Sequence, residues 1–144
     1  MSKINIIGKA STLFLSLSIL LSIGCANHVP SMKTDYSSAM NTKWVLEDID
    51  GHGITDFAHI WLRFDGDRKI YGSGGCNNFR SNYFIENNEF KTQPFAMTRK
   101  ACSPSLNIQE SKFMQALRNI RTMHTQDNIL YMTGSTHKLR FSKK

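Results

Sequence analysis

The chain has 144 residues, which is enough for one ordinary domain and a short additional segment. Its hydrophobic content of 40% and aromatic content of 10% exclude an intrinsically disordered chain and favour a packed core. The formal net charge is +7. Two of these charges, Lys3 and Lys9, belong to a predicted leader, so the remainder is basic without being extreme.

Residues 1–24 have the three parts of an export signal. Lys3 and Lys9 lie near the start, an apolar run extends from Leu13 to Ile23, and small residues follow it. A permanent membrane-spanning helix needs about 20 apolar residues, so this run is too short to be one. We therefore predict a signal peptide over residues 1–24.

The leader ends in Ser22-Ile23-Gly24-Cys25, which resembles a bacterial lipobox. This resemblance implies that Cys25 is lipidated on sulfur and becomes the new N-terminus after cleavage behind Gly24. An ordinary secretory signal and an uncleaved anchor are the alternatives. Ala26 follows the cysteine and resembles the pattern that directs lipoproteins to the outer membrane. We expect an outer-membrane protein that faces the periplasm or is exposed at the cell surface.

Residues 25–41 begin at the lipidated cysteine and are mostly polar. They contain Pro30 and several serines and show no sustained hydrophobic period. We interpret them as a flexible tether, followed by one domain over residues 42–144.

The first strands are predicted by two-residue alternation. Trp44 to Asp50 is the first, with Trp44 and Leu46 on one face. A predicted hairpin follows, in which Ile60 to Asp65 and Lys69 to Gly74 are joined by the turn Gly66-Asp67-Arg68.

A glycine-rich corner comes next, in Gly72-Ser73-Gly74-Gly75-Cys76-Asn77-Asn78. Glycine adopts backbone conformations that other residues avoid, and asparagine tolerates the left-handed region, so Gly72, Gly74, Gly75 and Asn77 predict a bend between two strands. A phosphate-binding loop is the weaker interpretation, because no Gly-Lys-Ser/Thr follows and the next segment is strand-like rather than helical.

The rest of the chain continues the antiparallel pattern. Phe79 to Glu86 and Glu89 to Thr92 flank Asn87-Asn88, which suits a tight turn. One amphipathic helix of about 13 residues is predicted after Cys102, with Ser103-Pro104-Ser105 as start signals. Asn107 and Glu110 are spaced as a capping pair, and the apolar stripe is expected to pack on the sheet. The final strands are Thr122 to Thr125, Ile129 to Thr133 and His137 to Phe141. The fold class is therefore mainly β (α+β): a small, curled antiparallel sheet or barrel of about seven to eight strands with one helix.

Residues along most of this domain resemble the META domain, the HslJ-like group of bacterial envelope and heat-shock proteins. The resemblance rests on Trp44-Val45-Leu46, Leu62-Arg63-Phe64, Gly72 to Phe79, Tyr83, Met97-Thr98, Ala101-Cys102, Glu110, Phe113, Leu117 and Leu139-Arg140-Phe141. It implies a small β fold in the cell envelope and a role in stress tolerance. It implies no catalytic residues.

The number of cysteines, three, is consistent with export. If Cys25 carries lipid, Cys76 and Cys102 remain as a pair in an oxidising compartment, as the META resemblance also implies, and we expect them to form a disulfide. A reactive thiol and a metal site are the weaker alternatives, because the close-spaced ligand pairs of zinc sites are absent from the sequence.

No motif predicts catalysis, a cofactor or a bound metal. The five histidines lack the short spacings of metal motifs, although His52 and His59 flank a loop that also contains Asp50 and Asp56. We expect no enzyme and, for an exported protein, no nucleic-acid partner. Clusters of basic residues suit anionic lipid or an acidic protein surface, or simply solvate an exposed face: Arg99-Lys100, Arg118 with Arg121, and Lys138, Arg140, Lys143 and Lys144.

Three functions fit these sequence features. The first is a non-catalytic module that is anchored to the membrane by its N-terminal lipid and interacts with an envelope protein or ligand, with a role in stress tolerance. The second is a small β-barrel carrier of an apolar ligand or acyl chain, which needs an unfilled interior. The third is an inhibitor of an envelope hydrolase, for which the protruding loop would be Gly51 to His59 or Pro94 to Ser105.

Overall fold

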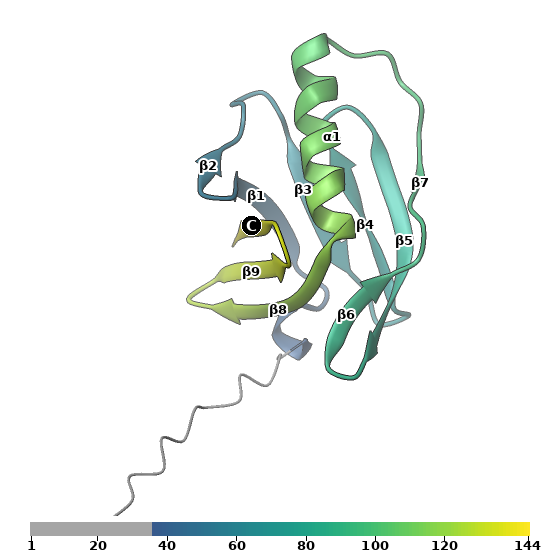
Figure 1. Ribbon diagram of the computed structural model, residues 1–144, viewed down its shortest axis with the longest axis vertical. Coiled ribbons are helices and arrows are strands. Elements are labelled where there is room, and N and C mark those ends of the chain that lie inside the picture. The colour runs from purple at the N-terminus through teal and green to yellow at the C-terminus, as the bar shows by residue number, and fades with distance from the viewer. Residues whose placement is uncertain (1–35) are drawn as a thin grey trace, which may run out of the picture. The chain divides into compact units, whose positions relative to one another are not determined.

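The structure is a computed structural model that describes residues 36–144. The predicted signal peptide, Cys25 and most of the tether lie outside the described residues. Eight antiparallel strands form one sheet in the order β6-β5-β4-β3-β1-β10-β9-β8 (Figure 1). They are β1 (Lys43–Ile49), β3 (Ile60–Phe64), β4 (Lys69–Gly74), β5 (Asn78–Glu86), β6 (Glu89–Thr92), β8 (Ile120–Gln126), β9 (Ile129–Gly134) and β10 (Lys138–Lys143).

Three short elements and one helix complete the domain. They are η1 (Ser37–Ala39), β2 (His52–Gly53), β7 (Ala96–Met97) and α1 (Pro104–Arg118). The first and last strands of the sheet, β6 and β8, lie next to each other, so the sheet curls into a nearly closed barrel. The predicted fold class, mainly β with a curled antiparallel sheet and one helix, is confirmed.

The predicted hairpins are also present. β3 and β4 pair around the turn that includes Gly66, and β5 and β6 pair around Asn87 and Asn88. These two asparagines have φ angles of 52° and 63°, as expected for a tight turn with positive φ at both central residues. Asp127 and Asn128 turn the chain between β8 and β9 in the same way, with φ angles of 50° and 63°.

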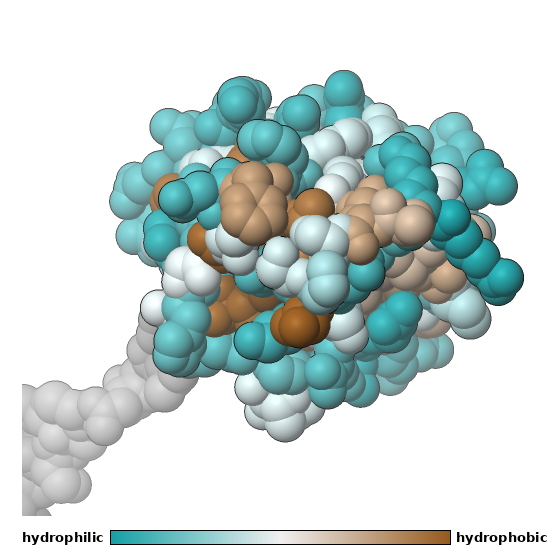
Figure 2. All heavy atoms as spheres, turned by 90° about the horizontal axis from the view of Figure 1, so that it is seen from above, coloured by the Kyte–Doolittle hydropathy of each residue, from teal (hydrophilic) through white to brown (hydrophobic). Residues whose placement is uncertain are grey.

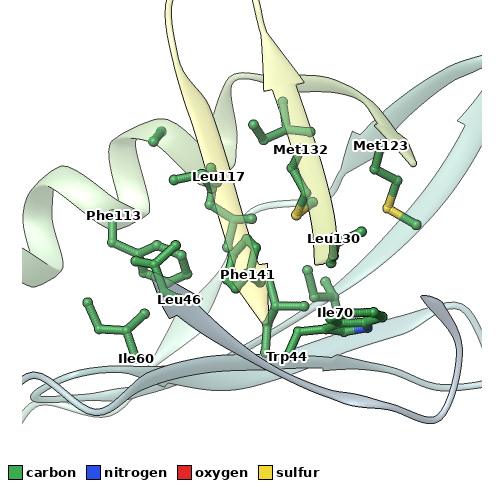
Figure 3. Packing of buried hydrophobic residues seen from close by; sticks show 14 of the residues in the cluster. Trp44, Leu46, Ile60, Ile70, Phe113, Leu117, Met123, Leu130, Met132 and Phe141 are labelled. Carbon is green, nitrogen blue, oxygen red and sulfur yellow. The ribbon is translucent and has the colours of Figure 1, made fainter. Parts of the chain in front are cut away.

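The interior of the barrel is filled by side chains. Alternate residues of the strands point inward, and Figure 3 shows labelled side chains from β1, β9, β10 and α1 converging there. Ile60, Leu62 and Phe64 of β3 are completely buried, as predicted. Other completely buried residues come from distant strands: Ile70, Phe90, Leu130, Met132 and Phe141. The interior of the barrel is therefore occupied by its own side chains, and a binding site is to be sought on the outer face.

Helix α1 packs its apolar stripe on the barrel, as predicted. The Phe113 ring lies 5.8 Å from the ring of Phe79 on β5 and 6.3 Å from that of Phe141 on β10, measured between centroids. The start signals Ser103-Pro104-Ser105 are confirmed, because the helix begins at Pro104 with Ser103 as its N-cap. The capping pair of Asn107 and Glu110 is wrong, because both residues lie inside the helix. Proline suits the first helical position, since its φ is already helical and it has no N–H to satisfy.

The packed part of the chain begins before the predicted start at residue 42. Ala39 of η1 is completely buried, and its carbonyl accepts a hydrogen bond from the Trp44 indole at 2.9 Å. The backbone N–H of Asn41 donates to the Phe64 carbonyl at 2.9 Å. A small residue at position 39 fits against the indole, so residues 37–41 are part of the domain. β2 and β7 are too short to show a sequence period.

Candidate functional site: a cationic groove on the outer face

The outward-facing side chains of four neighbouring strands form two rows. Pairing of β1, β3, β4 and β5 places Lys43, Arg63, Tyr71 and Arg80 in one row across the sheet. The second row contains Val45, Trp61, Ser73 and Asn78. Three cations therefore lie among two aromatic rings on one face.

Contacts within these rows hold the aromatic rings in place. The Lys43 ammonium lies 4.6 Å from the centroid of the Trp61 ring, a cation–π contact that contributes about 0.5–1 kcal/mol at an exposed site. Trp61 packs edge to face on Tyr71, with ring centroids 6.4 Å apart and an interplanar angle of 85°. The two rings form a fixed, partly exposed platform.

The positive charges of this face are not neutralised by neighbouring acids. Within residues 36–144, no carboxylate lies within 4.0 Å of Lys43, Arg63 or Arg80; the ion pairs there involve Lys69, Lys91, His137 and Arg140. The Nε atom of Arg63 is buried and has no hydrogen-bond partner among the described residues. These three cations are therefore not engaged in ion pairs among the described residues.

Two contiguous hollows run along this face. One, of about 570 Å³, is lined by Trp61, Tyr71, Gly72, Asn78, Phe79, Arg80, Ala96, Met97 and Thr98. The other, of about 590 Å³, is lined by Asp65, Lys69, Tyr71, Arg80, Ser81, Asn82, Gln93, Pro94 and Ala96. Because Tyr71, Arg80 and Ala96 line both, they form one trough, which we call the outer groove. It follows β5 from Asn78 to Asn82, a span of roughly 13 Å at the rise of a β-strand.

One end of the outer groove is fixed by the glycine-rich corner. Asn78 and Thr98 line this end, and the Thr98 hydroxyl accepts from the Asn78 backbone N–H at 3.1 Å. The Asn77 side-chain oxygen accepts from the Thr98 hydroxyl at 2.9 Å and from the Lys100 backbone N–H at 2.8 Å. Asn77 therefore connects β5 to the segment that follows β7 and positions one wall of the groove.

Glu110 lies beneath this corner. Its side chain is buried, with 8% of the residue surface exposed, and it extends from α1 to the turn between β4 and β5. Its carboxylate accepts hydrogen bonds from the backbone N–H groups of Cys76 and Asn77 and from the Asn77 side-chain amide. A buried carboxylate therefore provides the acceptors that these turn donors require.

The predicted corner residues have separate roles. Gly75 has a φ of +108°, which disfavours a side chain, and Gly74 has no room for one beside Glu110, whose Oε2 atom would lie 2.8 Å from an added Cβ. Gly72 lies within β4, where an added Cβ would be 2.0 Å from the Trp61 carbonyl oxygen. Gly72 therefore allows close pairing of β3 and β4 beneath the aromatic platform, and it does not form the bend.

Cys76 and Cys102 form a disulfide, with their Cα atoms 6.0 Å apart. The bond joins the corner to the segment that leads into α1. Together with the contacts of Asn77 and Glu110, the disulfide connects the corner, the segment after β7 and α1, which are distant in the sequence. Its place in the fold is structural, next to the groove and outside its lining.

The histidines and acids of the predicted loop do not form a metal centre. Asp50 instead pairs with His137, at 2.8 Å between Oδ2 and Nδ1, and accepts a backbone hydrogen bond from Lys138 at 2.7 Å. These two contacts hold the pKa of Asp50 below its ordinary value. Among the described residues, no three His, Cys, Asp or Glu side chains gather in an arrangement that could hold a metal ion.

The sequence predicted the corner and singled out Glu110 as part of the META resemblance and of a capping pair, but it did not predict the groove or the contact of Glu110 with the corner. The available signal for the groove was the outward position of cations and aromatics in alternating strands, and the signal for Glu110 was an acid on the apolar helical stripe of Leu106, Phe113 and Leu117. The predicted basic clusters do not line the groove.

A second surface feature lies at the end of the domain where α1 begins. Phe57 is 53% exposed and Ile108 is 58% exposed. Their segments lie side by side, because the Thr55 hydroxyl donates to the Gln109 side-chain oxygen at 3.4 Å. Figure 2 views this end and shows hydrophobic atoms surrounded by hydrophilic ones.

No helix within residues 36–144 has the length and apolarity needed to span a bilayer.

Comparison with known proteins agrees with this fold. The solution structure of a protein from Burkholderia xenovorans is similar, with 23% identity, a TM-score of 0.62, and coverage of 74% of this chain and 84% of that chain. A second solution structure has 25% identity and a TM-score of 0.59 and covers 73% of this chain and 91% of the other. A crystal structure of a DUF4847 family protein from Bacteroides vulgatus ATCC 8482 has 14% identity and a TM-score of 0.50, with coverage of 72% and 93%.

A search of curated proteins found no match. The META domain family matches residues 37–144, which include every strand of the barrel, α1 and the corner. The chain therefore belongs to the META domain family.

Proposed function

We propose that this protein is an exported, lipid-anchored recognition module of the cell envelope, without catalytic activity, and that it binds an anionic envelope component in the outer groove. The observation that carries the proposal is that Arg80 lines the groove beside two aromatic rings, with Lys43 and Arg63 in the same row of the sheet, and that none of the three forms an ion pair among the described residues. Cations that have no acidic neighbour attract anionic partners over long range and bind them by charge-assisted hydrogen bonds. Stress tolerance is the physiological role that the family resemblance suggests.

The filled interior supports recognition rather than transport. A carrier needs an apolar cavity that shields its ligand from water. In this barrel, large side chains from β3, β6 and β10, including Phe64, Phe90 and Phe141, are completely buried and occupy the interior. The groove on the outer face, by contrast, is open to a ligand.

Lipid anchoring is tested by replacing Cys25. The lipobox-like sequence supports lipidation of this residue. We expect Cys25→Ser to abolish incorporation of labelled fatty acid and to release the protein from the outer-membrane fraction. Incorporation of label into the variant, or wild-type protein recovered uncut in the cytosol, would contradict the anchoring proposal.

Recognition in the groove is tested by photocrosslinking in intact cells. A photoreactive amino acid at Ala96, which is exposed and lines both hollows, should capture an anionic envelope component. The same group at Gln126, an exposed residue of β8, is the matched control. Arg80→Gln should reduce capture from position 96. Equal capture from both positions, or capture that is unchanged in the variant, would count against the groove.

The exposed Phe57 favours a second candidate, inhibition of an envelope hydrolase. This ring stands on the loop between β2 and β3, within the segment predicted to protrude, and more than half of it is exposed. An exposed aromatic residue on a loop can enter a substrate cleft as an anchor. Phe57→Ala should relieve inhibition of such a hydrolase, and Ile85→Ala, at an exposed position on β5, should not. The lack of inhibition by the wild type would remove this candidate.

A further inference from the structure

We infer that the ligand of the outer groove is a carboxylate-bearing glycan chain, an inference that rests on the proposed recognition function. The shape of the groove is the first reason. The two hollows, of about 570 and 590 Å³, meet at Tyr71, Arg80 and Ala96 and continue along β5. A trough of this form fits several linked units of a chain better than one compact molecule.

The hydrogen-bonding groups of the groove belong to side chains. The backbone groups of its floor are engaged in the ladders between β3, β4 and β5. A polypeptide would bring its own N–H and C=O groups, which need partners, yet the strand at the rim, β7, has only two residues. A glycan instead presents hydroxyl groups, which side-chain amides and guanidinium groups can bind directly.

Suitable polar side chains are spaced along the trough. Asn78 and Arg80 are exposed on β5, and Asn82 follows on the same face. The Asn82 amide donates to the Gln93 side-chain oxygen at 3.1 Å, which leaves the Asn82 oxygen and the Gln93 amide for a ligand. The asparagine and glutamine side chains each carry a donor and an acceptor and Arg80 carries donors, so both kinds of partner are present for the hydroxyl groups of a glycan.

The floor of the groove is apolar and rigid. Trp61 and Tyr71 are held edge to face, and Ala96 and Met97 form the adjoining wall. The C–H groups on the faces of sugar rings are apolar and pack on aromatic and aliphatic surfaces of this kind. A fully apolar chain fits less well, because much of its surface would stay exposed to water in an open trough and the rest would face the polar amides of the groove.

The distribution of charge favours anionic groups, such as carboxylates, on the ligand. Arg80 lies at the junction of the hollows, and Arg63 and Lys43 continue the positive row across β3 and β1. At the far end, Asp65 already accepts backbone hydrogen bonds from Asp67 and Lys69. An anionic group is therefore favoured near Arg80, where it can form a bidentate pair with the guanidinium.

Binding is tested with four probes of similar length on the lipidated protein in non-ionic detergent. They are oligogalacturonate, a neutral malto-oligosaccharide, oligoglutamate and oligothymidylate. Titration calorimetry gives affinities, and tryptophan fluorescence gives the location, because Trp61 lines the groove whereas Trp44 is buried. We expect oligogalacturonate to bind tightest and to change Trp61 emission, and the neutral analogue to bind at least about tenfold more weakly.

Two exposed arginines supply the matched variants. Arg80→Gln should weaken oligogalacturonate binding about tenfold and leave the melting temperature unchanged, whereas Arg121→Gln on β8 removes the same charge away from the groove and should have little effect. Tighter binding of oligoglutamate or oligothymidylate, reduced by Arg80→Gln, would overturn the glycan assignment and preserve the recognition function. Binding of no probe, or equal losses in both variants, would overturn the glycan assignment, and photocrosslinking from Ala96 would then decide whether recognition in the groove also fails.

Discussion

Glu110 and Asn77 are joined at two points, through the backbone and the side chain of the asparagine. The Asn77 backbone N–H donates to Glu110 Oε2 at 2.5 Å, and its side-chain amide donates to Oε1 at 2.8 Å. The residues are 33 positions apart, and both are buried. Because Asn77 also binds Thr98 and Lys100, one carboxylate on α1 supports the corner that positions the end of the outer groove.

Removal of this carboxylate should destabilise the domain strongly. Glu110→Ala leaves the N–H groups of Cys76 and Asn77 buried without an acceptor, so we expect the free energy of unfolding to fall by about 3 kcal/mol. Urea denaturation followed by circular dichroism measures the change. Glu89→Ala, at an exposed position of β6, is the control and should change the stability by less than about 0.5 kcal/mol. Equal stability of the two variants would contradict the role of Glu110.

Alanine at Gly72 should disrupt the pairing of β3 and β4. Its Cβ would lie 2.0 Å from the Trp61 carbonyl oxygen, so the backbone itself must move, and we expect a loss of about 3 kcal/mol. Gly66→Ala is the control, since no atom lies within 4 Å of its added Cβ. Thermal unfolding compares the two. If Gly72→Ala were as stable as Gly66→Ala, close pairing of β3 and β4 at position 72 would not contribute to stability, and the prediction would be wrong.

Alanine at Gly74 should have a smaller effect through Glu110. The added Cβ would lie 2.8 Å from Glu110 Oε2, and a side chain can move more easily than a backbone carbonyl. We expect a loss of about 1–3 kcal/mol because the displaced carboxylate weakens its hydrogen bonds to the corner. In a Glu110→Ala background the effect of Gly74→Ala should largely disappear. An unchanged effect in that double variant would rule out this mechanism.

Loss of the disulfide should destabilise the folded domain. Cys76→Ser opens a link between residues 26 positions apart, which in the chain-entropy model costs about 3 kcal/mol. The variant should also expose one free thiol at Cys102, detectable by a thiol reagent after unfolding. Wild-type protein treated with reductant should show a similar decrease in melting temperature. An unchanged melting temperature in both experiments would contradict a stabilising disulfide.

The pair of Asp50 and His137 should make stability depend on pH in the acid range. Hydrogen bonds from His137 and Lys138 hold the pKa of Asp50 below its ordinary value of 3.8. Because the pKa is lower in the folded state, the stabilisation is present above about pH 4 and is lost as the pH falls through the folded-state pKa. Asp50→Asn should therefore lower the melting temperature near neutral pH and differ less from wild type below pH 3.

The matched control for this pair is Asp56→Asn, on the exposed loop after β2. Asparagine also tolerates the positive φ of 57° at position 50, so the substitution preserves the backbone conformation there. A difference between wild type and Asp50→Asn that stays constant from pH 7 to pH 2.5 would exclude ionisation of this carboxyl as the cause.

Local patterns in the sequence were enough to predict most strands and turns. Alternation placed Trp44 and Leu46 on a buried face, and the pair Asn87-Asn88 predicted a tight turn with positive φ at both residues. These features depend on neighbours in the chain, because side-chain period and turn geometry are local properties. The start signals Ser103-Pro104-Ser105 were likewise local and correct, whereas Glu110 was interpreted as a capping residue because its partner at the corner is distant in the sequence.

Tertiary structure alone decided which side chains meet. The sequence determined that Arg63 and Arg80 lie in strands, but pairing of β3, β4 and β5 brought them into one row with Tyr71. It likewise determined that Cys76 and Asn77 lie at a bend, whereas packing of α1 placed Glu110 beneath them. Strand order, register and helix docking depend on contacts between distant segments, and the local period of a strand or helix carries no information about its partner.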